Sequence, residues 1–132
     1  MKACAECVEM RSALAQEFRT MQPLFAALGD ETRQRIFLAL LESEQVGLRV
    51  GELTERTHLS RPAVSHHLRI LKDAELVRVH REGTRNYYYA NADTDRWAAL
   101  RTMAEHIDTV VRFAASAGYP NLGEEQEEQQ WN

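Results

Sequence analysis

The chain has few cysteines and no long hydrophobic run, and these absences limit the classes of protein to which it can belong. It has only two cysteines in 132 residues, so its core must form without a disulfide framework, which a chain of this length can do. No apolar run approaches the roughly 20 residues that a membrane span needs. The N-terminal residues MKACAECVEM include no apolar stretch of the kind found in secretory signals. The sequence therefore predicts one soluble globular domain in the cytoplasm, with no membrane partner.

Signatures of catalysis and of repeat architecture are also missing. The sequence has no visible internal repeat, no glycine-rich phosphate loop, no paired-carboxylate pattern and no clear Ser-His-Asp set. We therefore do not expect an enzyme.

The net charge of −4 is unevenly distributed along the chain. Four glutamates in the tail GEEQEEQQ are enough to account for all of it. Between Arg49 and Arg85, eight lysines and arginines stand against five acidic residues, and four of the five histidines fall there as well. A locally basic middle with acidic flanks is compatible with a surface that faces phosphates.

Helical periodicity dominates the first half of the chain. Apolar residues recur every four positions over 9–20, which predicts an amphipathic helix, and Pro23 interrupts this pattern. Gly29 suits a helix end, and Asp30 is expected to cap the next helix by accepting a hydrogen bond from a first-turn amide. A short helix is expected near 50–57. The side chains of the second helix that we expect to face a core are Ile36, Phe37, Leu40 and Leu41.

The periodicity changes after Leu76 from helical to alternating. Two β-rich runs flank the residues REGTR, which predicts a β-hairpin with Arg81 and Arg85 on either side of its tip. Asp93 is placed to cap a final helix that runs to about Ala117. The expected fold is mainly α with a small β-hairpin, a winged helix-turn-helix. We divide the chain into a flexible N-terminal segment (1–8), a winged helix-turn-helix domain (9–117) and a disordered acidic tail (118–132).

The helix expected from residue 61 has two different faces. At 100° per residue, His67 lies on the apolar face and points to the core, whereas the opposite face is polar and mostly basic. Such a face suits a helix that enters the major groove of DNA, although a merely solvated surface is the alternative. Adjacent histidines on a regular helix diverge by about 100° and cannot chelate one metal ion. The candidates for DNA contact are Arg61, Ser65, His66, Arg69 and Lys72, with Arg81 and Arg85 on the wing.

Two long stretches resemble the arsenic-repressor-like (ArsR/SmtB) family of bacterial winged helix-turn-helix transcriptional repressors. The opening signature of this family is similar to LFAALGDETRQRIFLALL, and its recognition helix is similar to LSRPAVSHHLRILKDAELV. The resemblance covers roughly residues 20–115, with the two stretches in the order and at the separation that the family has. It implies a homodimer with a helical interface formed by the first and last helices. Such a dimer would bind a pseudo-palindromic DNA operator and be released by an effector.

The metal sites known in the family that this chain resembles are missing or incomplete here. Sensors of arsenic, cadmium or lead often have Cys-Val-Cys where this chain has Arg49 and Gly51 at the cysteine positions. In the zinc sensors the ligands lie on the terminal helix, where Asp93 and His106 match and Asp95 is a third candidate. Zinc favours four well-placed ligands, so we expect this degenerate set not to hold a metal.

Glu75 is a further departure from the resembling family, which commonly has glycine after the recognition helix. A glutamate is costlier than glycine in a left-handed backbone conformation. We therefore expect this helix to end differently here.

Cys4 and Cys7 form a Cys-x-x-Cys pair near the N-terminus. Three interpretations stay open: two free thiols, a reversible disulfide, or half of a tetrahedral site for a thiophilic metal ion completed by the other protomer. No other cofactor is expected.

The leading hypothesis is a homodimeric, sequence-specific repressor that binds double-stranded operator DNA and is derepressed by thiol oxidation or a thiophilic metal. One alternative is a winged-helix module that binds protein, which would lack the clustered cations of the helix and the wing. Another is a repressor without an effector or a functional metal site. The proximity of Ser65 to His66 is adequately explained by DNA contact.

Overall fold

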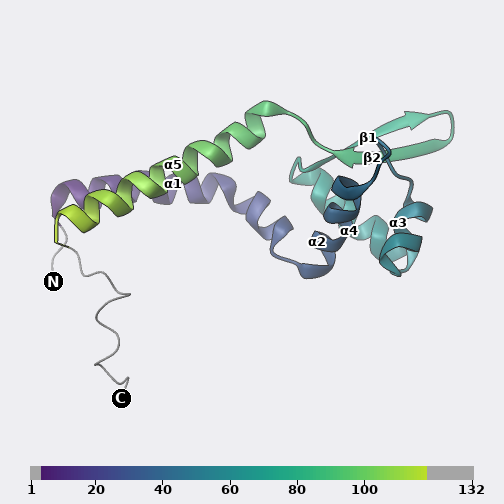
Figure 1. The fold of residues 1–132 in the computed structure, drawn as a ribbon, viewed down its shortest axis with the longest axis horizontal. Coiled ribbons are helices and arrows are strands. Elements are labelled where there is room, and N and C mark those ends of the chain that lie inside the picture. Colours follow the sequence, from purple (N-terminus) through teal and green to yellow (C-terminus); the bar gives the residue numbers. More distant parts are fainter. Residues whose placement is uncertain (1–3, 119–132) are drawn as a thin grey trace, which may run out of the picture. The chain divides into compact units, whose positions relative to one another are not determined.

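The computed structural model describes residues 4–118, which form five α-helices and one antiparallel β-hairpin (Figure 1). The elements are α1 (Ala5–Leu28), α2 (Glu31–Glu42), α3 (Val50–Thr57), α4 (Arg61–Asp73), β1 (Val77–Glu82), β2 (Arg85–Ala90) and α5 (Thr94–Ser116). This architecture confirms the predicted fold class. The predicted acidic tail lies outside the described residues, apart from Gly118.

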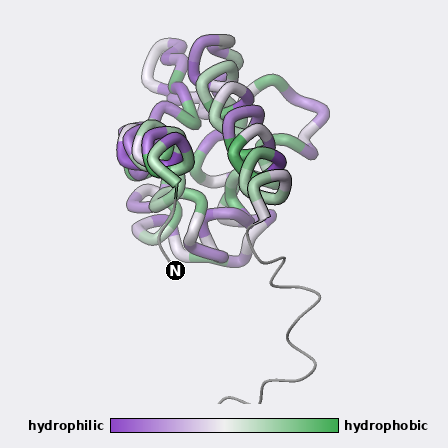
Figure 2. The backbone as a smooth tube through the Cα atoms, turned by 90° about the vertical axis from the view of Figure 1, so that its left-hand side faces the viewer, coloured by the Kyte–Doolittle hydropathy of each residue, from purple (hydrophilic) through white to green (hydrophobic). Residues whose placement is uncertain are grey.

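The described residues fall into two compact units. We call residues 4–20 and 97–118, which belong to α1 and α5, the helix pair. We call residues 21–96 the winged unit; it contains the end of α1, helices α2 to α4 and the hairpin. Figure 2 shows hydrophobic and hydrophilic residues interspersed along the backbone. Within the described part of the chain, no helix has the length and apolar character needed to cross a membrane.

Helix α1 is longer at both ends than the helix predicted at 9–20. It begins at Ala5 and continues through Pro23. A proline inside a helix loses a backbone hydrogen bond and costs about 3 kcal/mol or more. Beyond Pro23, Leu24 and Ala27 are each only 1% exposed, and their burial in the winged unit favours a continued helix. The predicted interruption at Pro23 was therefore wrong, because tertiary packing outweighs the local preference.

Helix α2 confirms the predicted cap and corrects one predicted core residue. Asp30 Oδ1 accepts a hydrogen bond from the Arg33 amide at 2.9 Å, as expected of an N-cap. Ile36 and Leu40 are buried, but Leu41 is 56% exposed. Because Leu41 lies about 100° around the helix from Leu40, it leaves the face that packs against the core.

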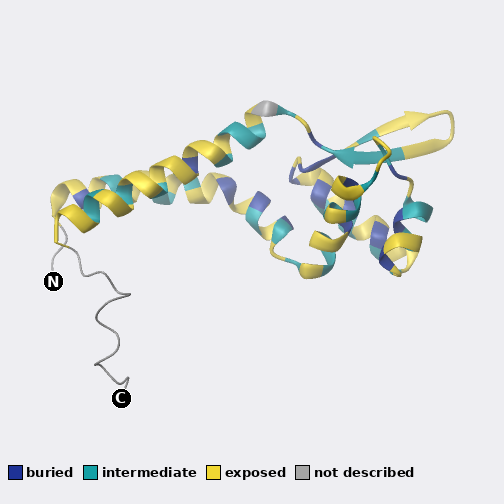
Figure 3. Ribbon diagram, viewed as in Figure 1, coloured by how far each residue is buried: buried dark blue, intermediate teal, exposed yellow. Residues whose placement is uncertain are grey.

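The core of the winged unit draws side chains from every helix in it and from the hairpin. Helices α2, α3 and α4 contact one another, and the hairpin contacts all three of them. Figure 3 shows buried positions on these helices. The side chains that are fully buried are Leu24, Ile36, Leu48, Leu53, Val64, Leu68, Leu71, Leu76 and Val77.

The wing pairs β1 with β2 through six opposed residue pairs, from Val77 opposite Ala90 to Glu82 opposite Arg85. Gly83 adopts a φ of +61°, which the first central residue of a tight two-residue hairpin turn requires. The hairpin prediction is confirmed. A third segment, which the sequence did not predict, joins the sheet where Leu48 and Tyr88 exchange two backbone hydrogen bonds of 2.8 Å.

Glu75 adopts the left-handed conformation that we expected it to avoid, with a φ of +61°. The Leu76 amide donates to the Leu71 carbonyl at 2.9 Å, as at helix ends that close on a left-handed residue. The Asn91 side chain donates to the Glu75 carbonyl at 2.6 Å and helps to hold this conformation. The helix therefore ends as it would with glycine, because the surrounding hydrogen bonds offset the local strain.

The helix pair brings α1 and α5 together in opposite directions. Cys7 near the start of α1 lines a small cavity with Val110 and Phe113 of α5, and Glu17 further along α1 pairs with His106. Cys7 and Met103 are its buried apolar side chains among the described residues, each 3% exposed. Most other positions of these helix segments are intermediate or exposed (Figure 3).

Candidate nucleic-acid interface

Helix α4 presents its polar face to solvent, as its sequence predicts. Ser60 caps the helix by accepting a hydrogen bond from the Ala63 amide at 3.2 Å, and Pro62 lies in the first turn. Val64, Leu68 and Leu71 are buried and fix the rotation of the helix. The candidate DNA-contact residues of this helix are all exposed: Arg61, Ser65, His66, Arg69 and Lys72.

The two adjacent histidines of α4 have different environments. The His66 and His67 rings lie 5.5 Å apart at an interplanar angle of 59°. His66 is exposed, whereas His67 is half-buried and its Nδ1 lies 3.5 Å from Arg33 Nε. Burial lowers the pKa of His67 below its usual value, although the nearby Asp30 carboxylate partly opposes this shift. His67 is thus a residue at the edge of the core.

The wing carries exposed cations at its tip. Arg81 Nε donates to the Gly83 carbonyl at 2.9 Å, so this side chain folds over the turn. Arg85 lies across the turn, opposite Glu82 in the strand register, and is exposed. Both arginines therefore occupy the positions that the sequence predicts for them.

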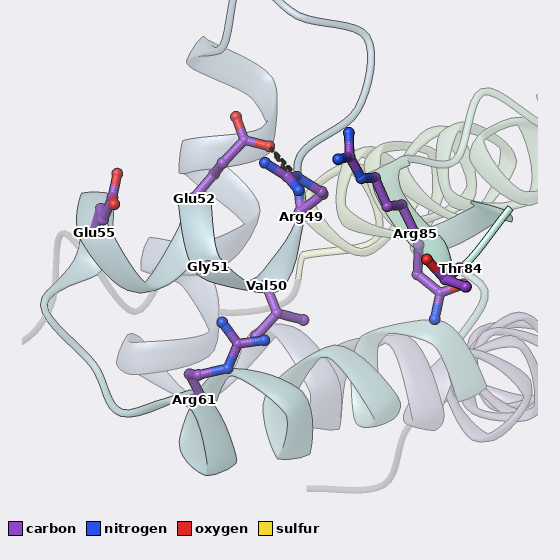
Figure 4. A pocket seen from close by; sticks show the side chains of 9 residues that line it. Arg49, Val50, Gly51, Glu52, Glu55, Arg61, Thr84 and Arg85 are labelled. Atoms are coloured by element: carbon purple, nitrogen blue, oxygen red, sulfur yellow. Dashed lines mark hydrogen bonds and ion pairs between the residues drawn. The ribbon is translucent and has the colours of Figure 1, made fainter. Parts of the chain in front are cut away.

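An open hollow of about 540 Å³ lies where the starts of α3 and α4 meet the wing tip. Three arginines line it, each from a different element: Arg49 precedes α3, Arg61 begins α4 and Arg85 begins β2 (Figure 4). The other lining residues are Val50, Gly51, Glu52, Glu55, Thr84 and Asn86. Arg49 is not among the predicted DNA-contact residues, because its nearness to the wing is a tertiary feature that the sequence pattern does not show.

Cys4 and Cys7 meet at the start of α1. The Cys7 amide donates a hydrogen bond to Cys4 Sγ at 3.2 Å. Hydrogen bonds from the Cys7 side chain and backbone lower the pKa of the Cys4 thiol. Cys4 is exposed and Cys7 is buried, and no disulfide joins the two. A more readily ionised, exposed sulfur is the form of cysteine that attacks oxidants and binds soft metals.

Two of the three residues of the degenerate metal set, Asp93 and His106, have other side-chain partners in the described structure. Asp93 accepts from the Asp95 amide at 2.9 Å and forms an ion pair with Arg78 at 3.2 Å. His106 pairs with Glu17. Within residues 4–118, no three His, Cys, Asp or Glu side chains gather in a way that could hold a metal ion.

Residues 30–79 match the family described as bacterial regulatory protein, arsR family. The chain is 41% identical over 71 residues to the transcriptional repressor SdpR of Bacillus subtilis, covering 54% of this chain and 76% of that protein. It is 39% identical over 105 residues to the HTH-type transcriptional regulator Rv2034 of Mycobacterium tuberculosis, covering 80% of this chain and 90% of that protein. Both relatives are transcriptional regulators by name, which agrees with the prediction that this chain is not an enzyme.

The fold has a counterpart among solved structures. The crystal structure of the ArsR family transcriptional regulator RHA00566 matches with a TM-score of 0.59. The match covers 71% of this chain and 92% of that one at 19% sequence identity, so it bears on the fold alone.

Proposed function

This chain belongs to the arsR family of bacterial regulatory proteins, and we propose that it represses transcription as a homodimer that binds operator DNA in the cytoplasm. The observation that carries the proposal is the polar face of α4. Ser65, Arg69 and Lys72 are exposed on it while the opposite face is anchored in the core. A helix with exposed donors and a fixed rotation suits readout of base edges in the major groove.

The test compares variants of the polar face with a matched arginine elsewhere. Operator DNA is recovered as the genomic fragments that the purified protein retains. Replacing Ser65 or Arg69 by alanine should weaken operator binding by roughly 1–3 kcal/mol, because each removes a contact to a base or a phosphate. Arg101→Ala removes an exposed arginine of α5 and should leave affinity almost unchanged. Unchanged operator affinity in both the Ser65 and Arg69 variants would exclude α4 from the groove.

Apolar side chains that the helix pair leaves exposed support a dimer. Val8, Phe18 and Val111 are 44%, 42% and 60% exposed. A two-fold dimer through α1 and α5 would bury such side chains and present two copies of α4 to half-sites about one DNA turn apart. Native mass spectrometry of reduced protein tests the dimer directly, since a monomer at micromolar concentration would contradict it.

Cys4 and Cys7 are the sensor that we propose for release of DNA. Hydrogen peroxide would convert the two thiols to one disulfide, and the two electrons and two protons lost would reduce the peroxide to two waters. A disulfide would draw Cys7 Sγ toward Cys4 and away from the cavity that it lines with Val110 and Phe113. A thiophilic metal on both sulfurs would have a similar effect. The disulfide or the bound metal releases DNA only if it favours a dimer conformation that does not bind DNA.

The switch is tested by comparing the native protein with a Cys4→Ser, Cys7→Ser double variant. Hydrogen peroxide or Cd²⁺ should weaken operator binding by the native protein and leave the double variant unaffected. Equal responses of the two proteins would contradict a sensor at these cysteines. If neither protein responds, the alternative of a repressor without a thiol effector is the better account.

A further inference from the structure

We propose that the hollow lined by Arg49, Arg61 and Arg85 holds a phosphate of the DNA backbone. In the absence of DNA, the Glu52 carboxylate pairs with Arg49 in place of the phosphate. This inference deepens the proposed function and rests on it, because it assigns a second contact region to the same DNA. It adds Arg49, which lies on neither the recognition helix nor the wing.

The three arginines converge from separate elements on one hollow. Arg61 reaches toward Gly51 from the start of α4, and Arg49 lies between Glu52 and Arg85 (Figure 4). Guanidinium groups suit phosphate, because their N–H groups form a planar fork that matches its oxygens. The hollow is open to solvent and lies between the start of α4 and the wing tip, the two parts proposed to bind the duplex. A backbone that spans them would pass over it.

Gly51 leaves room for one of these arginines. A Cβ atom at this position would lie 3.2 Å from Arg61 Nη1. That spacing is tighter than an ordinary van der Waals contact, so with a larger residue the guanidinium group would have to shift by a few tenths of an ångström. The small residue therefore lets Arg61 lie against the first turn of α3.

Glu52 of the same chain competes with the phosphate for Arg49. Its Oε1 accepts from the Arg49 amide at 3.1 Å, which caps α3, and lies 3.5 Å from Arg49 Nε. The Arg49 side chain is still 47% exposed, so it can exchange this carboxylate for a phosphate. Three arginines against Glu52 and Glu55 leave the hollow with one net positive charge.

The first experiment measures affinity for a random-sequence 30-base-pair duplex as a function of salt concentration. Arg49→Ala should weaken binding roughly tenfold at 0.1 M salt and reduce the log-log salt slope by about 0.9, the value for one phosphate contact. Arg56→Ala is the matched control, since Arg56 is an exposed arginine of α3, the helix that Arg49 precedes, and does not line the hollow. A slope that changes equally in the two variants would overturn the proposal.

The second experiment predicts a gain of binding. Glu52→Gln keeps a side-chain oxygen for the cap of α3 but removes the charge that competes with phosphate. It should tighten binding to random DNA roughly threefold, because the net charge of the hollow rises from one to two. Glu44→Gln is the control for loss of a charge at an exposed site outside the hollow. Unchanged or weaker binding by the folded Glu52→Gln variant would contradict the competitor role.

The outcomes also separate this inference from the proposed function. If Ser65 and Arg69 variants lose operator affinity while Arg49→Ala and Glu52→Gln behave like their controls, the function stands and the phosphate site fails. If the native protein binds no DNA, both fail. The hollow could instead hold a free oxyanion; inorganic phosphate at constant ionic strength would then raise the melting temperature of the native protein but not of Arg49→Ala. That result, with DNA affinity unchanged in Arg49→Ala, would overturn a DNA phosphate site.

Discussion

The winged unit and the helix pair differ in how completely their apolar side chains are buried. Every large side chain with less than 2% exposure in the described residues belongs to the winged unit. In the helix pair, Cys7 and Met103 reach 3% exposure, while Phe18 and Val111 stay 42% and 60% exposed. The winged unit thus has a closed core of its own, although Leu38, Leu41 and Val46 on its surface are also exposed. The helix pair buries only Cys7 and Met103 among its described apolar side chains. This difference in core burial is what the proposed function expects of a DNA-binding unit that folds around its own core and a helix pair that a second copy completes.

The largest effect should come from opening the core of the winged unit. Leu68 is 1% exposed on the inner face of α4, so Leu68→Ala should lower the free energy of unfolding by about 2–5 kcal/mol through lost burial and a cavity. Urea denaturation followed by circular dichroism measures this loss. Leu41→Ala is the control, because Leu41 is 56% exposed and its truncation should cost less than about 0.5 kcal/mol. Similar losses in both variants would show that burial on the inner face of α4 does not determine the stability of the winged unit.

The next largest effect should be on dimerisation, which we expect to depend on the helix pair and not on the winged unit. Val111→Glu places a charge on the exposed apolar surface of α5, and it should raise the dimer dissociation constant at least tenfold, or about 1.4 kcal/mol. Leu41→Glu introduces the same charge at a similarly exposed apolar residue of the winged unit. It should leave the dimer intact. Analytical ultracentrifugation measures both, and dissociation of Leu41→Glu alone would assign the interface to the winged unit.

Local patterns predict the winged unit well wherever a residue's neighbours in sequence decide its environment. The caps at Asp30 and Ser60, the turn at Gly83 and the two faces of α4 follow from periodicity and from donors and acceptors a few residues apart. The predicted DNA contacts of that helix lie on its exposed face, but their roles depend on a partner and stay predictions. The sequence pattern wrongly predicted an interruption at Pro23, because the burial of residues beyond Pro23 keeps the helix continuous.

Contacts between distant segments could not be predicted in the same way. The bridge between Leu48 and Tyr88 joins residues 40 positions apart, and Arg49 reaches the wing only because of that arrangement. Nothing in the periodicity around Leu48 indicates such pairing. For the same reason, the left-handed Glu75 depends on Asn91, whose side chain reaches back to its carbonyl. Composition and spacing define the elements, whereas the candidate phosphate site arises from their packing.

A smaller effect should show that the winged unit can be stabilised without changing the helix pair. Glu75 has a φ of +61°, which glycine adopts without steric cost, so Glu75→Gly should raise the free energy of unfolding by roughly 0.5–1 kcal/mol. The ion pair of Glu75 with Arg96, at 3.7 Å, is exposed on the glutamate side and offsets little of this gain. The measurement is urea denaturation, with the dimer dissociation constant expected to stay the same. Loss of stability would mean that the carboxylate matters more than the backbone strain.

The smallest effect concerns pH and distinguishes the histidines of the two units. Burial lowers the pKa of His67 in the folded winged unit below its ordinary value of 6.5, so the folded state binds this proton less tightly than the unfolded chain. The stability that neutral His67 allows is complete above pH 6.5 and is lost as the pH falls through the lowered folded pKa. His67→Gln should therefore reduce the fall in melting temperature between pH 7.5 and pH 5. His106→Gln in the helix pair is the control, because it leaves His67 and its effect on the melting temperature in place. Identical pH profiles for the native protein and His67→Gln would show that protonation of His67 does not limit the winged unit.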